Sequence, residues 1–136
     1  MKEPDIRWVQ RFSNFERAFL LLSKAIAIET PSIVERAGLI QFFEMAFELS
    51  WKLLKDYEEQ EGITAKTLRD VIKQAYQAGL ITRGHDWMNA LQDRNLMAHT
   101  YSEKTAIAVE SKIRHEYFPL LDELYGLFKT KLEATP

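Results

Sequence analysis

Hydrophobic residues recur along this chain at the three- and four-residue spacing of α-helices. The first such series, within about Asp5–Ile28, has the seam expected of a packed bundle helix: Trp8, Phe12, Phe15, Phe19, Leu22 and Ile26. No alternation of apolar and polar residues persists beyond a few positions, and no Asn-Gly or Asp-Gly turn occurs. The pattern therefore predicts an all-α protein.

A second, longer helix is expected over Ile33–Gln60. Ser32 precedes it and Glu35 lies three residues further on, which is the spacing of a capping box. The polar residues of this helix form one narrow stripe, made of Gln41, Glu44, Glu48, Lys52, Lys55 and Glu59. Because nearly all other positions are apolar, we expect the helix to pack on two or more sides. The stripe is interpreted as a solvated face, with a catalytic role for Glu44 or Glu48 as the alternative.

Two shorter helices are predicted next. The first covers about Ala65–Ala78, with Gly79 at the position after its end, where glycine is favoured. Residues 80–84 are predicted to form a loop. The second of these helices should begin at residue 85 or 86 and end within residues 98–100.

The last helix is expected to start after Ser102, a favoured N-cap residue, and to be kinked or split near Tyr117 by Pro119. Three long and two short amphipathic helices with short connections indicate one domain, an antiparallel helical bundle filling residues 1–136. The apolar content, above all that of the second helix, exceeds what one bundle would cover. We therefore expect a homodimer.

Composition limits the class of protein. Of 136 residues, 46% are hydrophobic and 28% are charged, which is typical of a soluble globular domain. The chain has no cysteine, no apolar leader and no transmembrane pattern, so we expect a cytoplasmic protein. The net charge of −2 argues against a protein that coats nucleic acid, but it leaves room for a small basic site.

One stretch, residues 93–101, departs from the helical pattern. The apolar stripe at positions 87, 91, 94 and 98 is interrupted by Arg94, and a core charge is unfavourable unless it is paired or faces a solvated cleft. On an ideal helix Arg94 and His99 lie about 140° apart. They can act together only if the helix ends near Ala98 or if a second copy supplies the missing partner. Asn95 and His99, four residues apart, can share a face.

These residue types would suit the cleavage of RNA. The 2′-hydroxyl would attack the neighbouring phosphorus, with His99 as general base or acid and Arg94 stabilising the phosphorane charge. Asn95 or Asp93 would be the supporting polar group. The reaction needs no metal, and the three histidines lack metal-ligand spacing, so we expect neither a metal nor a cofactor.

Residues 94–101, Arg-Asn-Leu-Met-Ala-His-Thr-Tyr, resemble the Arg-x4-His-x-Tyr motif of the HEPN superfamily, and more narrowly that of the nucleotidyltransferase substrate-binding proteins. Two further stretches support the resemblance: Phe-Glu-x3-Glu-x2-Trp-Lys at residues 43–52 and Asp-Trp-Met at residues 86–88. The likeness extends from about Arg11 to Phe128.

The resemblance implies an up-and-down helical bundle that dimerises with the motif near the dimer cleft. It also implies a minimal nucleotidyltransferase, encoded alongside, as a partner in a complex. In toxin–antitoxin pairs of this kind the bundle is a metal-independent ribonuclease, so Arg94 and His99 would be the catalytic pair, followed by the polar Asn95. Tyr101 matches the tyrosine that the transferase adenylylates to silence the toxin. An alternative view makes the bundle a non-catalytic subunit that presents a nucleotide or other substrate to the transferase.

Structural alternatives stay open for the same residues. Arg94 could pair with Asp93, Glu44 or Glu48 while His99 caps a helix C-terminus. Arg94 and His99 could instead form an ion network in a purely structural dimer. Tyr101 could pack at the start of the last helix.

Overall fold

The structure, a computed structural model, describes residues 7–134. Its elements are α1 (Arg7–Ile26), α2 (Ile33–Gln60), α3 (Leu68–Gln77), α4 (Gly84–Asp93), the 3-10 helix η1 (Arg94–His99), α5 (Glu103–Lys112), the π-helical η2 (Ile113–Tyr117) and α6 (Phe118–Ala134). Since η1 continues α4, and η2 joins α5 to α6, these elements make five helical segments, and no strand occurs within the described residues. The predicted all-α helical bundle is confirmed.

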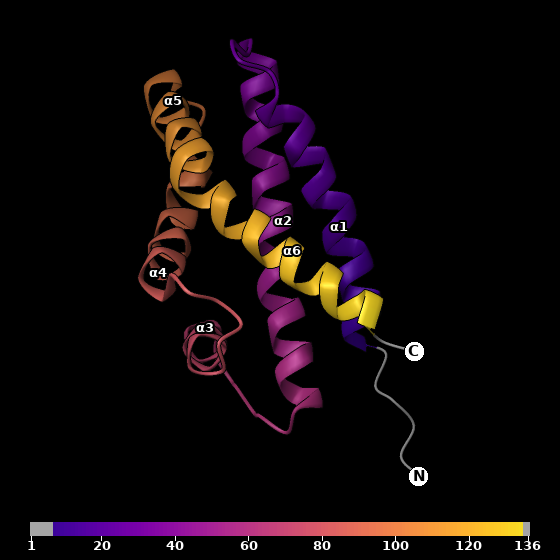
Figure 1. Cartoon of the computed structure of the whole chain (residues 1–136). Helices are drawn as coiled ribbons and strands as arrows, with labels where there is room; N and C mark the ends of the chain where they lie inside the picture. Colours follow the sequence, from indigo (N-terminus) through magenta and orange to yellow (C-terminus); the bar gives the residue numbers. More distant parts are fainter. Residues whose placement is uncertain (1–6, 135–136) are drawn as a thin grey trace.

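Helix α2 is the central element of the bundle. Figure 1 shows α1 beside it on one flank, with α3, α4 and α5 on the other, while α6 crosses α2 diagonally. The buried apolar residues of α2 face these neighbours: Leu39, Ile40, Phe43, Ala46, Phe47, Leu53 and Leu54. The prediction that this helix packs on two or more sides is therefore confirmed. None of the helices in residues 7–134 has the length and apolarity needed to cross a membrane.

Stacked aromatic rings fix the outer helices on the core. Phe19 of α1 stacks on Tyr125 of α6 with ring centroids 4.6 Å apart. On the other flank, Phe47 of α2 stacks on Trp87 of α4 at 5.9 Å, and Trp87 is buried. Such pairs contribute about 0.5–1.5 kcal/mol beyond the burial of their area. The second pair fixes α4 against α2, and with it the point from which η1 starts.

Several helix ends follow the signals in the sequence. The Ser32 hydroxyl accepts a hydrogen bond from the Glu35 N–H at 3.1 Å, and the Ser32 N–H donates to the Glu35 carboxylate at 2.9 Å. This is the predicted capping box. Gly79 has φ of +77°, a backbone conformation that favours glycine after a helix end.

Other ends differ from the prediction. Helix α1 ends at Ile26, two residues early, and its predicted start at Asp5 lies outside the described residues. Helix α3 begins at Leu68 instead of residue 65, because the Thr67 hydroxyl accepts a hydrogen bond from the Asp70 N–H at 3.1 Å and caps the helix there.

The last helical segment is interrupted where Pro119 predicts. The π-helical η2 directly precedes α6, and Pro119 lies in the first turn of α6. Because proline has no N–H to donate to the preceding turn, a wider turn accommodates it. Figure 1 shows that α6 runs in a different direction from α5. Ser102 is the N-cap residue of α5 as expected, although its side chain makes no capping hydrogen bond.

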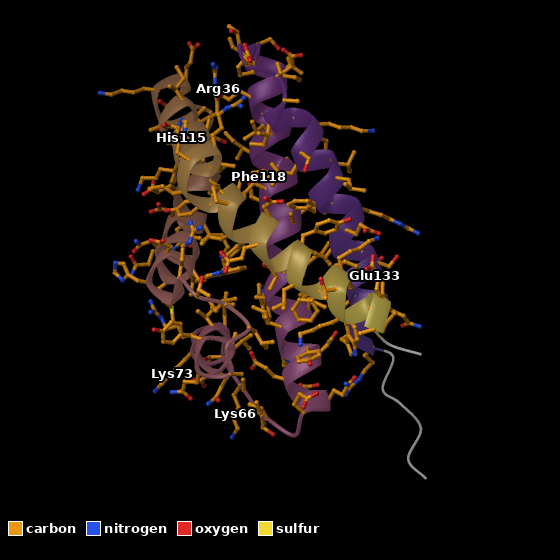
Figure 2. The ribbon with its side chains drawn as sticks, viewed as in Figure 1. Arg36, Lys66, Lys73, His115, Phe118 and Glu133 are labelled. Carbon is orange, nitrogen blue, oxygen red and sulfur yellow. The ribbon has the colours of Figure 1, made fainter. Side chains whose placement is uncertain are left out.

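A buried charge network ties the end of α1 to α2 and α5. Arg114 donates to the carbonyl oxygens of Ile26 and Ile28 and to Glu110, each at 2.7 Å. Glu110 also accepts from Arg36 at 2.7 Å, and Figure 2 shows Arg36 between α5 and α2. Burial raises the pKa of Glu110, but the hydrogen bonds and charges of the two arginines outweigh it, so this pKa lies below its usual value.

Candidate functional site

Arg94, Asn95 and His99 of the motif lie on the 3-10 helix η1, not on an α-helix, and Tyr101 follows it in a turn. Helix α4 stops at Asp93 and the chain tightens over Arg94–His99, which corrects the prediction that the α-helix continues to residues 98–100. In a 3-10 helix residues three apart share a face, so Asn95 and His99 do not, contrary to the expectation. The tightening buries Met97 and exposes Ala98, which places the bulkier apolar side chain in the core.

Asp93 anchors the start of this turn to the bundle. Its Oδ2 atom accepts hydrogen bonds from Lys112 at 2.9 Å and from the Tyr117 hydroxyl. Burial, together with the hydrogen bond and charge of Asp93, raises the pKa of Tyr117 well above its usual value. The hydrogen bond from Lys112 to Asp93 likewise raises the pKa of Lys112. Asp93 therefore holds the end of α4 on α5 and η2.

Arg94 contacts one residue of α2, Glu48. Its Nη1 atom lies 3.5 Å from Glu48 Oε2, and the two side chains are 41% and 42% exposed. Glu48 is also 3.7 Å from Lys52. Exposed pairs of this kind contribute about 0–1 kcal/mol. Of the three structural partners considered for Arg94, the structure shows only Glu48, and the guanidinium is both weakly paired and open to solvent.

His99 and Tyr101 also lie on the surface. The two rings meet edge to face, with centroids 6.2 Å apart and planes at 75°. Tyr101 is 87% exposed, so it does not pack into the bundle at the start of α5. Asn95 is exposed as well.

Within one copy of the chain, Arg94 and His99 both lie on η1 but do not contact each other. At about 120° and about 2 Å per residue, the five steps from Arg94 to His99 leave the two residues about 120° apart around the helix and about 10 Å apart along it. Among the described residues, no hydrogen bond or ion pair connects Arg94 with His99.

Two hollows border the motif. One of about 260 Å³ lies between the start of α2 and the segment after η1, and Ile33, Ala37 and Tyr101 are among its lining residues. The other, of about 380 Å³, lies between α3 and the junction of α4 with η1, where Arg94 and Asn95 line it. The motif therefore faces concave surface on both sides.

The burial of Glu58, the most unusual carboxylate of the described residues, was not predicted from the sequence. This residue is 1% exposed, and neither carboxylate oxygen has a hydrogen-bond partner in the described structure. Burial raises the pKa of Glu58 to about 8. One signal could have revealed it: Glu58 follows the buried Leu54 by four residues and so falls outside the polar stripe of α2.

The helical bundle and the exposed Arg-x4-His-x-Tyr segment together define a protein of the HEPN type. Residues 10–130 match the family described as nucleotidyltransferase substrate binding protein like. The chain belongs to this family.

Individual relatives agree with this assignment. Over 91 residues the chain is 35% identical to a Haemophilus influenzae Rd protein named probable ribonuclease HepT, and the match covers 61% of this chain and 62% of the relative. The match thus spans less than two thirds of that relative's length. A crystal structure of a Thermus thermophilus protein is similar at 34% identity, with a TM-score of 0.76 over 82% of this chain and 96% of the other.

A second solved structure, from Haemophilus influenzae, is described as revealing the fold of a substrate binding domain of a nucleotidyltransferase. It shares 28% identity with a TM-score of 0.77, over 87% of this chain and 98% of the other. Both structures therefore share the helical fold across most of their length.

Proposed function

We propose that this protein is a metal-independent ribonuclease of the HEPN toxin type that acts with, and is silenced by, a minimal nucleotidyltransferase. The observation that carries the proposal is the exposure of both Arg94 and His99 on the 3-10 helix η1, where Arg94 has a single weak ion pair at 3.5 Å. Similarity to a relative named probable ribonuclease HepT supports it.

In the proposed reaction the 2′-hydroxyl oxygen of one nucleotide attacks the adjacent phosphorus. His99 accepts the hydroxyl proton as a general base, and the Arg94 guanidinium donates hydrogen bonds to the phosphorane oxygens. The bond from phosphorus to the 5′-oxygen then breaks, and that oxygen takes up a proton. The products are a 2′,3′-cyclic phosphate and a 5′-hydroxyl.

The direct test incubates the purified chain with labelled RNA in the presence of a chelator. We expect cleavage, and we expect His99→Ala and Arg94→Ala each to slow it by about 10²–10⁴-fold. Asn14→Ala, a change at an exposed position of α1, is a control that should cleave at the normal rate. Equal cleavage by the wild-type chain and His99→Ala would remove His99 from the mechanism.

The separation of Arg94 from His99 adds a second part to the proposal: the site is completed by a second copy of the chain. Apolar side chains exposed near the motif offer a surface for such a dimer, with Ile33 68%, Val34 80%, Leu96 46% and Ile107 48% exposed. A two-fold axis would place His99 of one copy beside Arg94 of the other. Each dimer would then contain two such sites, each with one Arg94 and one His99.

Mixing two inactive variants tests this arrangement. If the site combines Arg94 of one copy with His99 of the other, a heterodimer of the Arg94→Ala and His99→Ala chains contains one intact site. After denaturation and refolding together, about a quarter of the normal activity should return, because about half of the dimers are mixed and one of their two sites is complete. No recovery from preparations shown by native mass spectrometry to contain mixed dimers would contradict a shared site.

Tyr101 is the proposed target of the transferase. Its phenol oxygen would attack the α-phosphorus of ATP, releasing pyrophosphate and the phenolic proton. The ring is 87% exposed and lies against His99, so the added phosphate would occupy the space in front of the catalytic pair. Mass spectrometry after incubation with the transferase and ATP should show an adenylyl group, which Tyr101→Phe should abolish. Tyr76→Phe, at another exposed tyrosine, should not abolish it.

A second candidate function is a non-catalytic subunit that presents a nucleotide to the transferase. The family description and the second solved structure favour it. Calorimetry with nucleotides, with and without the transferase, separates the two functions. Nucleotide binding by a chain whose RNA cleavage is unaffected by His99→Ala would support this second function and exclude the first.

A further inference from the structure

A groove runs along α3 and α4 away from the candidate catalytic turn. At one end is the hollow of about 380 Å³ that Arg94 and Asn95 line. It adjoins a second hollow, of about 450 Å³, between α3 and the start of α4. Arg69 lines both hollows, so they lie side by side along α3 and α4, and the hollow with Arg94 and Asn95 borders the motif. We call the two hollows together the α3–α4 groove.

The α3–α4 groove is basic although the whole chain is acidic. Its lining includes the cations Arg69, Lys73, Arg83 and Arg94, against the single carboxylate Asp70, whereas the net charge of the chain is −2. Figure 2 shows Lys73 extending outward from α3.

Two of these cations have carboxylate neighbours outside the groove lining. Glu123 lies 3.7 Å from Arg83, and Glu48 lies 3.5 Å from Arg94. Exposed pairs this long are weak, so a phosphate group can replace the carboxylate. The groove can therefore bind a chain of phosphates at several points.

An aromatic ring lies at the far end of the groove. Tyr76 is 57% exposed, and its ring rests on Gly84 so closely that a Cβ atom there would approach it to 3.2 Å. Because glycine has no Cβ atom, the ring can lie close to the backbone of residue 84 while Tyr76 stays largely exposed. An exposed aromatic ring between cations is the arrangement that binds single-stranded nucleic acid, with bases on the ring and phosphates on the cations.

We propose that the α3–α4 groove binds single-stranded RNA next to the scissile phosphate, with Tyr76 as a stacking platform and Arg69 and Lys73 as phosphate contacts. The ten residues of α4 rise about 15 Å, which is about four nucleotides at the 3.4 Å spacing of stacked bases. The proposal rests on the proposed ribonuclease function, because the groove begins at Arg94. It extends that function by assigning the substrate class: single-stranded segments several nucleotides long.

Binding is tested in the His99→Ala chain, which leaves the RNA intact. Fluorescence anisotropy with a labelled single-stranded ten-nucleotide RNA should show that Tyr76→Ala weakens the affinity about tenfold. Arg69→Ala with Lys73→Ala should lower the slope of log K against log salt by about 1.4, or about 0.7 for each phosphate contact.

The matched control removes two cations from the opposite flank of the bundle. Arg17 and Lys24 are exposed on α1, which lies across α2 from the groove (Figure 1). Arg17→Ala with Lys24→Ala makes the same charge change and should leave the salt slope unaltered. An equal loss of slope in both double variants would show only general electrostatics and would overturn the proposal.

Cleavage assays separate this proposal from the one on which it rests. With His99 intact, the groove variants should cleave a dinucleotide at the normal rate but need about tenfold more of the ten-nucleotide RNA to reach half-maximal rate. Normal affinity of the groove variants together with RNA cleavage would overturn the groove and leave the ribonuclease standing. Groove-dependent binding by a chain that cleaves no RNA would support the groove and overturn the ribonuclease. Loss of binding to the nucleotidyltransferase, with RNA affinity unchanged, would assign the groove to a protein partner instead.

Discussion

Arg114 and Arg94 both lie where an α-helix gives way to another kind of helix, yet the molecule holds them in opposite ways. The Arg114 side chain is 16% exposed and makes three hydrogen bonds of 2.7 Å. The Arg94 side chain is 41% exposed and has one contact at 3.5 Å. The two arginines cannot be told apart by their charge or by the irregular backbone around them.

The difference in bonding shows what each arginine can do. The guanidinium of Arg114 is committed to Glu110 and to carbonyl groups left unpaired at the end of α1, so a phosphate would have to displace short, buried bonds. Breaking the contact between Arg94 and Glu48 costs little free energy, so the planar guanidinium of Arg94 can donate two hydrogen bonds to a phosphate instead. Few and weak partners, in an exposed position, distinguish the arginine suited to a ligand from the one suited to the fold.

The largest effect is expected for Arg94→Ala, which should lower activity strongly and stability hardly at all. Arg94→Ala should slow RNA cleavage by about 10²–10⁴-fold while changing the free energy of unfolding by less than about 1 kcal/mol. Single-turnover rates and urea denaturation measure the two quantities in the same preparation. Should Arg94→Ala lose several kcal/mol of stability, the contrast with Arg114 would disappear.

Arg114→Ala should give the opposite result. Its removal leaves Glu110 and two carbonyl groups with fewer partners in a buried position, so we expect unfolding to become easier by about 3–5 kcal/mol. Urea denaturation measures this loss. Arg114→Lys keeps the positive charge, but its single ammonium group cannot reach the same three acceptors. Its free energy of unfolding should lie between those of the wild-type chain and Arg114→Ala. Unchanged stability in Arg114→Ala would mean that the network is not structural.

Much of the fold was predictable because its signals are local. The capping box at Ser32 and the interruption by Pro119 depend on residues only a few positions apart. The Arg114 network was not predictable, because its carbonyl partners are 86 and 88 residues away in the chain. The change from α- to 3-10 geometry after Asp93 was missed because it depends on how α4 docks on α5 and η2.

The candidate site was predictable in part. Arg94 was predicted as a site residue because it interrupts an apolar stripe. The resemblance to the Arg-x4-His-x-Tyr motif indicated roles for His99 and Tyr101. Whether Arg94 is buried, and which carboxylate it meets, depended on the distance between α2 and η1. The α3–α4 groove could not be predicted from the sequence, because Arg69 and Arg94 come close only when α3 packs beside α4. No pattern within α3 alone indicates it.

The comparison of Arg114 with Arg94 assumes that a buried ionisable group needs hydrogen-bond partners. Glu58 tests this assumption, because it is buried and has none in the described structure. Its pKa is about 8 in the folded protein against a usual value of 4.5, so the folded state retains a proton that the unfolded chain releases. Stability should therefore fall as the pH rises from about 4.5 to about 8, by about 1.4 kcal/mol per unit, and level off above. Glu58→Gln removes the proton release that stabilises the unfolded chain, and should raise the free energy of unfolding at pH 7 by about 3 kcal/mol.

Urea denaturation at about pH 5, 7 and 9 measures this effect of Glu58→Gln. The control is Glu61→Gln, an exposed carboxylate three residues away, which should change stability little at any pH. A flat pH profile in the wild-type chain between about pH 5 and 8 would show that Glu58 finds a partner in solution.

The smallest expected effect concerns Glu48, the partner that Arg94 should release. Glu48→Gln removes a pair whose side chains are 41% and 42% exposed, so the free energy of unfolding should change by less than about 1 kcal/mol. A carboxylate beside Arg94 competes with the phosphate of RNA, so its loss should lower KM about two- to fivefold and leave kcat nearly unchanged. Glu59→Gln, on the same stripe of α2, should change neither constant. A hundredfold fall in kcat for Glu48→Gln would place Glu48 in the catalytic machinery and show that its pairing with Arg94 orients the guanidinium.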